Sequence, residues 1–190
     1  MKFVLILFAA VFSNNYVLSK TLGICPFLGV SKRLSQAVGM GVAVTFVMVL
    51  ATAVTWPIQT YLLDRFGLGY LQTIAFILVI AALVQFVEIV LKKFMPSLHR
   101  SLGVYLPLIT TNCAVLDVAI SNINEKYTFL EALTNAFGGG VGFLLAMVLF
   151  AGVRSRMEDD EAVPAAFKGL PITLIAAAIV SLSFMAFTLK

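Results

Sequence analysis

The sequence predicts an all-α integral membrane protein with six transmembrane helices, arranged as a 3+3 inverted-topology repeat with broken first and fourth helices. Three observations support this fold class. The mean hydropathy is +1.04. Only 12% of the residues are charged, whereas a soluble domain carries about 25%. The two halves of the chain also share a sequence pattern, so residues 1–190 are expected to form a single membrane domain.

The charged residues cluster and leave long apolar segments between them. Four segments contain no Asp, Glu, Lys or Arg and two contain a single charge; they are residues 34–63, 66–87, 132–153, 169–189, 3–31 and 101–124. A helix through any of these segments is long enough to cross a hydrocarbon core of ~30 Å. The first segment also resembles a secretory signal peptide. We expect it to be retained, because the repeat requires it as its first helix.

Lysine and arginine residues are distributed unequally between the two ends of the predicted spans. Eight of them flank one side and four flank the other. Because basic loops remain in the cytoplasm, this bias predicts that both termini lie outside. The net charge of +4 therefore reflects topology, and no basic stripe with interleaved aromatic residues indicates binding to nucleic acid.

An internal repeat relates the two halves of the chain. Residues 36–54 and 135–153 match at a constant offset of 99, with eight identities in nineteen positions. The repeats themselves are expected to comprise residues 1–94 and residues 100–190. Because each repeat has three spans, the second copy enters the membrane from the opposite side, and equivalent residues approach one another near the midplane.

The chain contains only two cysteines, and they occupy equivalent positions in the two repeats. Cys25 aligns with Cys113 at an offset of 88, with a matching Leu and Val after each cysteine. Helix-disrupting residues near both cysteines predict that the first and fourth helices are broken; they are Gly23, Pro26, Gly103 and Pro107. Broken helices at membrane depth require protein or a cavity to satisfy the freed backbone groups.

A thiolate in hydrocarbon is costly unless a metal or another group binds it. Two thiols brought together by an inverted repeat therefore predict half of a metal site at Cys25 and Cys113. Zinc sites and iron–sulfur clusters normally take four ligands, so a second chain would have to supply the other two. Two alternatives are open at this point: small core residues without a ligand, and a disulfide.

Ionisable and amide side chains near the cysteines are further candidates. Asp117 lies one helical turn after Cys113, and Asn15 and Asn112 lie beside the two breaks. These three residues are candidates for an ion path or for support of the metal ligands. We expect Lys20 to extend its amine towards the membrane interface. Because the sequence contains no P-loop and no dinucleotide fingerprint, the chain is not expected to bind NAD on its own.

Two sequence regions resemble a known family. Residues 14–18, NNYVL, and 22–32, LGICPFLGVSK, are similar to the start of the A subunit of the bacterial Rnf electron-transport complex, and residues 103–116, GVYLPLITTNCAVL, match its second signature. The resemblance extends nearly from end to end. The E subunit of the sodium-pumping NADH:quinone oxidoreductase is a close relative, but its first cysteine motif typically lacks the proline found here at Pro26. Asp117 departs from the family pattern, in which a small residue is expected.

The resemblance implies a component of an ion-translocating oxidoreductase in the bacterial cytoplasmic (inner) membrane. Two homologous six-helix subunits of opposite orientation would share one [2Fe–2S] cluster, with two ligands from this chain, Cys25 and Cys113, and two from the partner. The cluster would carry electrons between cytoplasmic iron–sulfur and NAD-binding subunits and flavin-carrying membrane subunits exposed outside. The complex would couple ferredoxin:NAD⁺ oxidoreduction to the translocation of Na⁺ or H⁺.

A different class of protein also fits the bottom-up observations. A small inverted-repeat transporter could bind a solute at the broken helices and use its cysteines only structurally. In such a transporter, Cys25→Ser combined with Cys113→Ser would leave transport intact. In an electron carrier, the same double substitution would abolish the cluster and electron transfer while the other subunits still insert.

Overall fold

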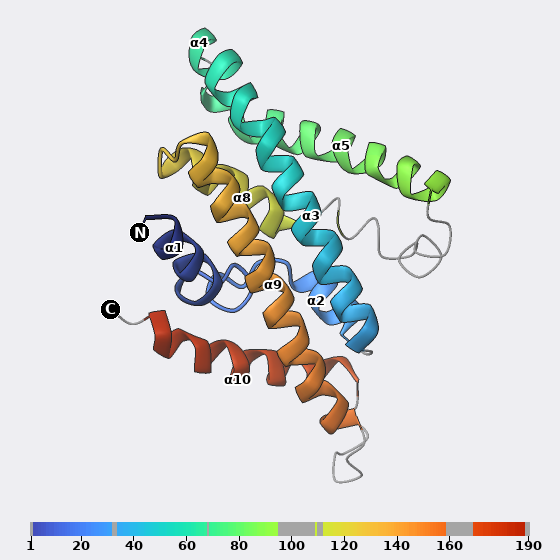
Figure 1. Ribbon diagram of the computed structural model, residues 1–190. Helices are drawn as coiled ribbons and strands as arrows, with labels where there is room; N and C mark the ends of the chain where they lie inside the picture. The colour runs from blue at the N-terminus through green and yellow to red at the C-terminus, as the bar shows by residue number, and fades with distance from the viewer. Residues whose placement is uncertain are drawn as a thin grey trace.

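The computed structural model describes residues 2–31, 34–67, 69–94, 109, 112–158 and 169–188. These residues form helices and connecting turns without a β-strand (Figure 1). In chain order the elements are α1 (Lys2–Phe8), η1 (Ala9–Ser13), α2 (Ile24–Val30), α3 (Leu34–Ile58), η2 (Gln59–Leu63), α4 (Asp64–Phe66), η3 (Gly69–Leu71), α5 (Gln72–Phe94), α8 (Cys113–Asn124), α9 (Phe129–Glu158) and α10 (Leu170–Thr188). The predicted all-α class is confirmed for this part of the chain.

Three helical stretches in the described ranges are long and apolar enough to cross a membrane: Leu34–Phe66, Gly69–Ile89 and Phe129–Met157. They coincide with three of the predicted spans. The other predicted spans contain shorter apolar helices, namely Lys2–Ser13, Cys113–Asn124 and Pro171–Met185. The helices are therefore those of a membrane protein, while the complete six-span arrangement stays a prediction.

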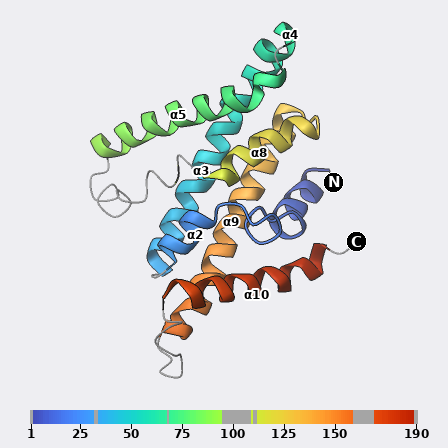
Figure 2. The same cartoon turned by 180° about the vertical axis from the view of Figure 1, so that it is seen from behind.

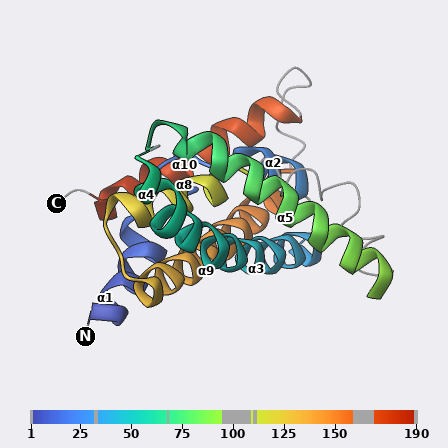
Figure 3. The ribbon, with the colours of Figure 1, turned by 90° about the horizontal axis from the view of Figure 1, so that it is seen from above.

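The antiparallel pair α3 and α9 forms the centre of the molecule. The two helices run side by side in opposite directions (Figure 1, Figure 3), and two glycines allow their close approach. A Cβ atom on Gly140 would lie 2.7 Å from the Cα of Thr45, and a Cβ atom on Gly41 would lie 3.0 Å from the Cα of Leu144. Small residues at these positions therefore set the distance between the helices, as is common in membrane proteins.

The helices α5 and α10 lie at opposite ends of this central pair (Figure 2). Each presents a row of large apolar side chains that the rest of the described chain leaves exposed: Ile74, Leu78, Phe86, Leu174, Ile179 and Leu182. An apolar surface of this extent suits contact with lipid or with another membrane protein, because water would solvate it poorly.

The first predicted span is interrupted, as the sequence predicts. Helical structure ends at Ser13 and resumes at Ile24. The connecting segment contains two residues with left-handed backbone conformations, Thr21 at φ 55° and Gly23 at φ 76°. Pro26 does not cause the break: it is the third residue of α2, and in the first turn of a helix the backbone N–H has no intrahelical acceptor to lose. The expectation that Pro26 interrupts the helix is thus corrected.

The equivalent segment of the second repeat is described only from its helical part. The helix α8 begins at Cys113, and Asn112 is its N-cap. The two residues expected to break this span, Gly103 and Pro107, lie outside the described residues. The described part therefore places Cys113 at the start of a helix, as expected for a cysteine that follows a break.

Gly140→Ala is expected to destabilise the protein, because the added methyl group would meet the backbone of Thr45. Overpacking of this kind typically costs about 1–3 kcal/mol. The midpoint of thermal unfolding of the detergent-solubilised protein should fall. Gly152→Ala is the matched control, since a Cβ atom there would have no neighbour within 4 Å. Equal midpoints for the two variants would contradict the close packing of α3 on α9.

Candidate functional site

The two segments that carry the cysteines lie against each other. The backbone N–H of Gly23 donates a hydrogen bond to Sγ of Cys113 at 3.0 Å. Cys25 follows Gly23 by two residues. The fold therefore brings the start of α2 to the start of α8, and both cysteines belong to one junction between these helices.

The junction requires glycine at position 23 for two reasons. Its backbone φ of 76° lies in the left-handed region, which residues with a side chain rarely adopt. A Cβ atom there would also lie 3.0 Å from Oδ1 of Asn112 and 3.0 Å from the ring of Phe143. Because nothing but hydrogen fits between these groups, Gly23 allows the backbone to approach Cys113.

Both cysteines are free and exposed on the surface of the single chain, so the disulfide alternative is not what the structure contains. Cys113 is the first residue of α8 and Cys25 is the second residue of α2. The amino end of α8, where Cys113 lies, carries a partial positive charge. The two thiols are thus placed where a group outside this chain can reach them.

The donor set of the junction fits half of a thiolate-ligated metal cluster. Across the ranges that the structure describes, no group of three or more His, Cys, Asp or Glu side chains could hold a metal ion. Two thiols supply two of the four ligands of an iron–sulfur cluster. The hydrogen bond from Gly23 to Cys113 is of the kind that tunes such clusters. A complete site would need two further ligands from another chain.

Asn112 supports the start of α8 directly beside Cys113. Its Oδ1 atom accepts a hydrogen bond from the backbone N–H of Ala114 at 3.0 Å, which satisfies one of the free donors of the first turn. Its Nδ2 atom is buried and has no hydrogen-bond partner. A buried donor without an acceptor is unfavourable. Asn112 therefore caps α8, and its Nδ2 atom remains without a hydrogen-bond partner at the junction.

Asn15 stabilises the break in the first span. Its side chain is completely buried and makes four hydrogen bonds to backbone groups. Nδ2 donates to the carbonyls of Val11 at 3.1 Å and Gly142 at 3.0 Å. Oδ1 accepts from the N–H groups of Val17 at 3.0 Å and Leu18 at 3.2 Å. Asn15 thus replaces lost helical hydrogen bonds and ties the turn to α9.

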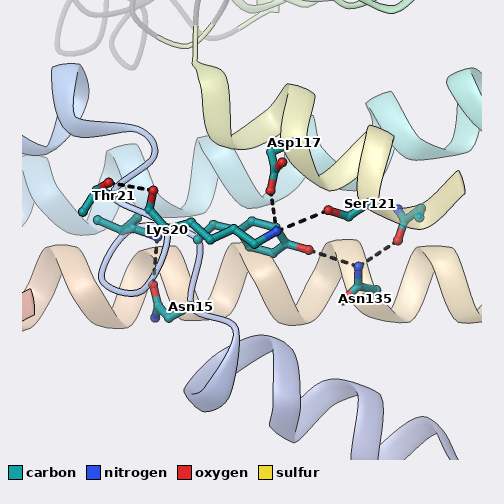
Figure 4. A network of polar contacts seen from close by, with 9 residues as sticks. Asn15, Lys20, Thr21, Asp117, Ser121 and Asn135 are labelled. Atoms are coloured by element: carbon teal, nitrogen blue, oxygen red, sulfur yellow. Dashed lines mark hydrogen bonds and ion pairs between the residues drawn. The ribbon is translucent and has the colours of Figure 1, made fainter. Parts of the chain in front are cut away.

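Lys20 and Asp117 form an ion pair between the first break and α8 (Figure 4). Nζ of Lys20 lies 2.8 Å from Oδ2 of Asp117 and 3.4 Å from Oγ of Ser121, and it lies 4.9 Å from the centre of the Tyr16 ring. The ammonium group of Lys20 thus has a carboxylate partner that the sequence did not assign, while its side chain is 40% exposed. The extension of Lys20 towards the membrane interface stays a prediction. Lys20 is the single charge of residues 3–31 and Asp117 that of residues 101–124. Their opposite signs are the sequence signal for this pair.

A chain of hydrogen bonds links Tyr16, whose ring contacts the ammonium group of Lys20, to α8 and α9. The hydroxyl of Tyr16 accepts from Nδ2 of Asn135 at 3.2 Å, and the same Nδ2 donates to Oδ1 of Asn122 at 2.7 Å. Asn122 and Asn135 are both buried. Buried polar groups that satisfy one another hold their elements in a fixed arrangement, so this chain connects the break to α8 and α9.

Arg154 is a positioning residue that sequence reasoning missed. In the sequence it is one of the basic residues that follow the fifth span, yet it is buried. Its Nη1 atom donates to the carbonyl of Leu28 at 2.7 Å and to Oγ of Ser31 at 2.9 Å. It therefore satisfies a carbonyl at the carboxyl end of α2, which a short helix leaves without an intrahelical donor. The position of Arg154 directly after the charge-free segment 132–153 is the sequence signal for this role.

Comparison with known proteins gives the class of this protein. Residues 3–190 match the family described as Rnf-Nqr subunit, membrane protein. The chain therefore belongs to the Rnf-Nqr family of membrane subunits, which confirms the resemblance predicted from the two cysteine motifs.

Individual relatives are similar over almost their whole length. The A subunit of the Na(+)-translocating ferredoxin:NAD(+) oxidoreductase complex of Acetobacterium woodii is 58% identical over 188 residues, which cover 99% of this chain and 97% of that protein. The A subunit of the ion-translocating oxidoreductase complex of Syntrophotalea carbinolica is 58% identical over 183 residues, covering 96% and 94%. The corresponding protein of Shewanella loihica is 51% identical over 187 residues, covering 98% and 97%.

Gly23→Ala should disrupt the junction, because the new methyl group has no space beside Asn112 and Phe143 and the backbone conformation is unfavourable. We expect the hydrogen bond to Cys113 to be lost and Cys113, which is already exposed, to react more slowly with a maleimide, because the N–H group of Gly23 no longer stabilises negative charge on the sulfur. Gly69→Ala is the control, since it has an ordinary backbone conformation and no neighbour within 4 Å of a Cβ atom. An unchanged labelling rate in Gly23→Ala would contradict this description of the junction.

Arg154→Met should loosen the carboxyl end of α2, because two hydrogen bonds from a charged group are lost. Each such bond typically contributes about 1.5–3 kcal/mol. The expected result is a lower thermal midpoint and faster maleimide labelling of Cys25. Arg156→Met, at an exposed position on the same helix, is the control and should behave as the wild type. Equal effects of the two substitutions would show that Arg154 does not hold α2.

Proposed function

We propose that this chain is the A-type membrane subunit of an ion-translocating ferredoxin:NAD⁺ oxidoreductase complex, and that it carries electrons across the membrane through a [2Fe–2S] cluster. The observation that carries this proposal is the contact between Gly23 and Cys113. It brings the starts of α2 and α8 together and leaves both thiols exposed. The names of the relatives, which are A subunits of ion-translocating oxidoreductase complexes, support the same function.

In this proposal Cys25 and Cys113 bind iron through their thiolates. The bound cluster supplies one-electron transfer. The N–H group of Gly23 stabilises the negative charge on the sulfur of Cys113, and Asn112 holds the first turn of α8 in place. Asn15 fixes the turn that precedes α2 through its four hydrogen bonds. The chain therefore contributes two ligands and the rigid surroundings that orient them.

The two remaining ligands are proposed to come from a homologous six-helix subunit of opposite orientation. A cluster shared between two chains would lie where their exposed cysteine surfaces face each other. Electrons would enter and leave through cytoplasmic iron–sulfur and NAD-binding subunits and through flavin-carrying membrane subunits. This chain would be a translocase component that does not itself bind NAD, placed in the inner membrane with both termini outside.

A reciprocal contact supports the proposed 3+3 inverted repeat. Gly41 packs against Leu144, and Gly140 packs against Thr45. At the repeat offset of 99, Gly41 corresponds to Gly140 and Thr45 corresponds to Leu144. Exchanging the two repeats thus exchanges the two contacts, as a two-fold axis requires. The antiparallel course of α3 and α9 (Figure 1) is consistent with such an axis lying in the membrane plane.

The alternative function is a small inverted-repeat transporter with structural cysteines. The polar network around Lys20 and Asp117 is compatible with a solute site. The two functions differ in what they require of the thiols, because only the electron carrier needs a sulfur atom at positions 25 and 113.

Cys25→Ser should remove the cluster, since a hydroxyl group is a poor substitute for a thiolate on iron. The measurement is low-temperature EPR with iron analysis on the purified complex after reduction with dithionite. The [2Fe–2S] signal should be present in the wild type and absent from Cys25→Ser. Ser35→Ala, at an exposed position, is the control and should keep the signal. An assembled Cys25→Ser complex with an unchanged spectrum would refute the cluster and favour the transporter.

A further inference from the structure

A polar cavity lies beside the ion pair of Lys20 and Asp117. Its volume is 210 Å³, which gives room for several water molecules. The helical start of the chain, α1 and η1, contributes only apolar side chains to its wall. The polar lining includes Tyr16, Lys20, Ser121, Glu125, Tyr127 and Asn135. A cavity of this kind in a membrane chain is suited to water or to a charged species.

The cavity follows one side of α8. Asp117, Ser121 and Glu125 succeed Cys113 at intervals of four residues, so they share one side of the helix. With a rise of ~1.5 Å per residue, Asp117 lies ~6 Å along the axis from Cys113 and ~12 Å from Glu125. Glu125 is exposed. The polar lining on α8 thus runs from the chain surface at Glu125 to Ser121. Asp117, which is bound to Lys20 of the lining, lies one turn further towards Cys113.

The charges around the cavity favour a cation. Lys20 and Glu125 are the charged residues in its described lining, and the carboxylate of Asp117 is bound to Lys20. The lining itself thus holds one charge of each sign, and Asp117 at its border brings the count to two carboxylates and one ammonium group. Hydroxyl and amide oxygens from Ser121, Tyr16 and Asn135 lie close by, and oxygen is the preferred ligand of small hard cations.

We propose that this cavity binds a small monovalent cation, Na⁺ or hydronium, and that this cation and the ammonium group of Lys20 alternate as the partner of Asp117. The proposal rests on the proposed function of the chain in an ion-translocating complex, and names the site at which this chain meets the ion. Lys20 lines the cavity, and the carboxylate of Asp117, which is 30% exposed, borders it at 2.8 Å from the ammonium group of Lys20.

The ion pair couples the departure of Lys20 from Asp117 to the arrival of the cation. A carboxylate away from bulk water is costly without a positive partner, so Lys20 can leave Asp117 only when another cation arrives. The long side chain of Lys20 has other interactions within the cavity region, with the ring of Tyr16 and the hydroxyl of Ser121. Glu125 lines the same cavity and offers a second carboxylate.

The test is infrared difference spectroscopy on the purified membrane complex. One series exchanges K⁺ for Na⁺ at constant pH, and a second changes the pH at constant Na⁺. A carboxylate band that responds to Na⁺ identifies sodium as the ligand, and a band that responds only to pH identifies the proton. The band should disappear in Asp117→Asn. In Lys20→Met the half-saturating cation concentration should fall roughly tenfold, because the ammonium group of Lys20 no longer competes with the cation for Asp117.

Control variants separate this proposal from the cluster and from misfolding. Glu88→Gln changes a carboxylate on α5 that does not line the cavity, and it should keep the band. The double variant Lys20→Met with Asp117→Asn removes both charges, should assemble, and should lack the band. The EPR signal of the cluster should persist in every one of these variants. A band that survives in Asp117→Asn, an unshifted titration in Lys20→Met, or no cation-dependent band in the wild type would overturn the cation site.

Discussion

The hydrogen bonds of Asn15 are the interaction on which the junction depends. A helix that breaks inside a membrane leaves backbone groups that water cannot satisfy. Asn15 supplies two donors and two acceptors to that backbone from a fully buried position. Because the turn is held in this way, the chain can reverse towards Gly23 and start α2 against Cys113. The same side chain is bonded to Gly142 of α9, so the break is fixed to the most buried part of the molecule.

The structure separates a tightly packed centre from exposed outer helices. Glycines at positions 41 and 140 bring α3 and α9 into backbone contact, and polar residues bind the broken segments to that centre. The outer helices α5 and α10 keep large apolar side chains exposed. A rigid centre suits a group whose geometry has to be precise, while exposed apolar faces suit lipid and neighbouring subunits.

Much of the site could be predicted from the sequence. Two cysteines at repeat-equivalent positions, each near helix-disrupting residues, led to the correct expectation that the first helix is broken and that the cysteine segments approach each other. The pairing of Lys20 with Asp117 was not predicted, because an offset between repeats says nothing about which side chains touch across them. Pro26 was misjudged because a proline disrupts a helix only beyond its first turn. Arg154 looked like a loop residue, and only the tertiary fold brings α2 beneath it.

The helix α2 is held at both of its ends. At its amino end, the N–H group of Gly23 donates a hydrogen bond to Cys113. At its carboxyl end, Arg154 donates hydrogen bonds to the carbonyl of Leu28 and the hydroxyl of Ser31. A rod of seven residues fixed in this way has little freedom to shift or rotate. If the sulfur of Cys25 ligates iron, its position will change little when the metal gains or loses an electron, and a site that does not reorganise exchanges electrons quickly.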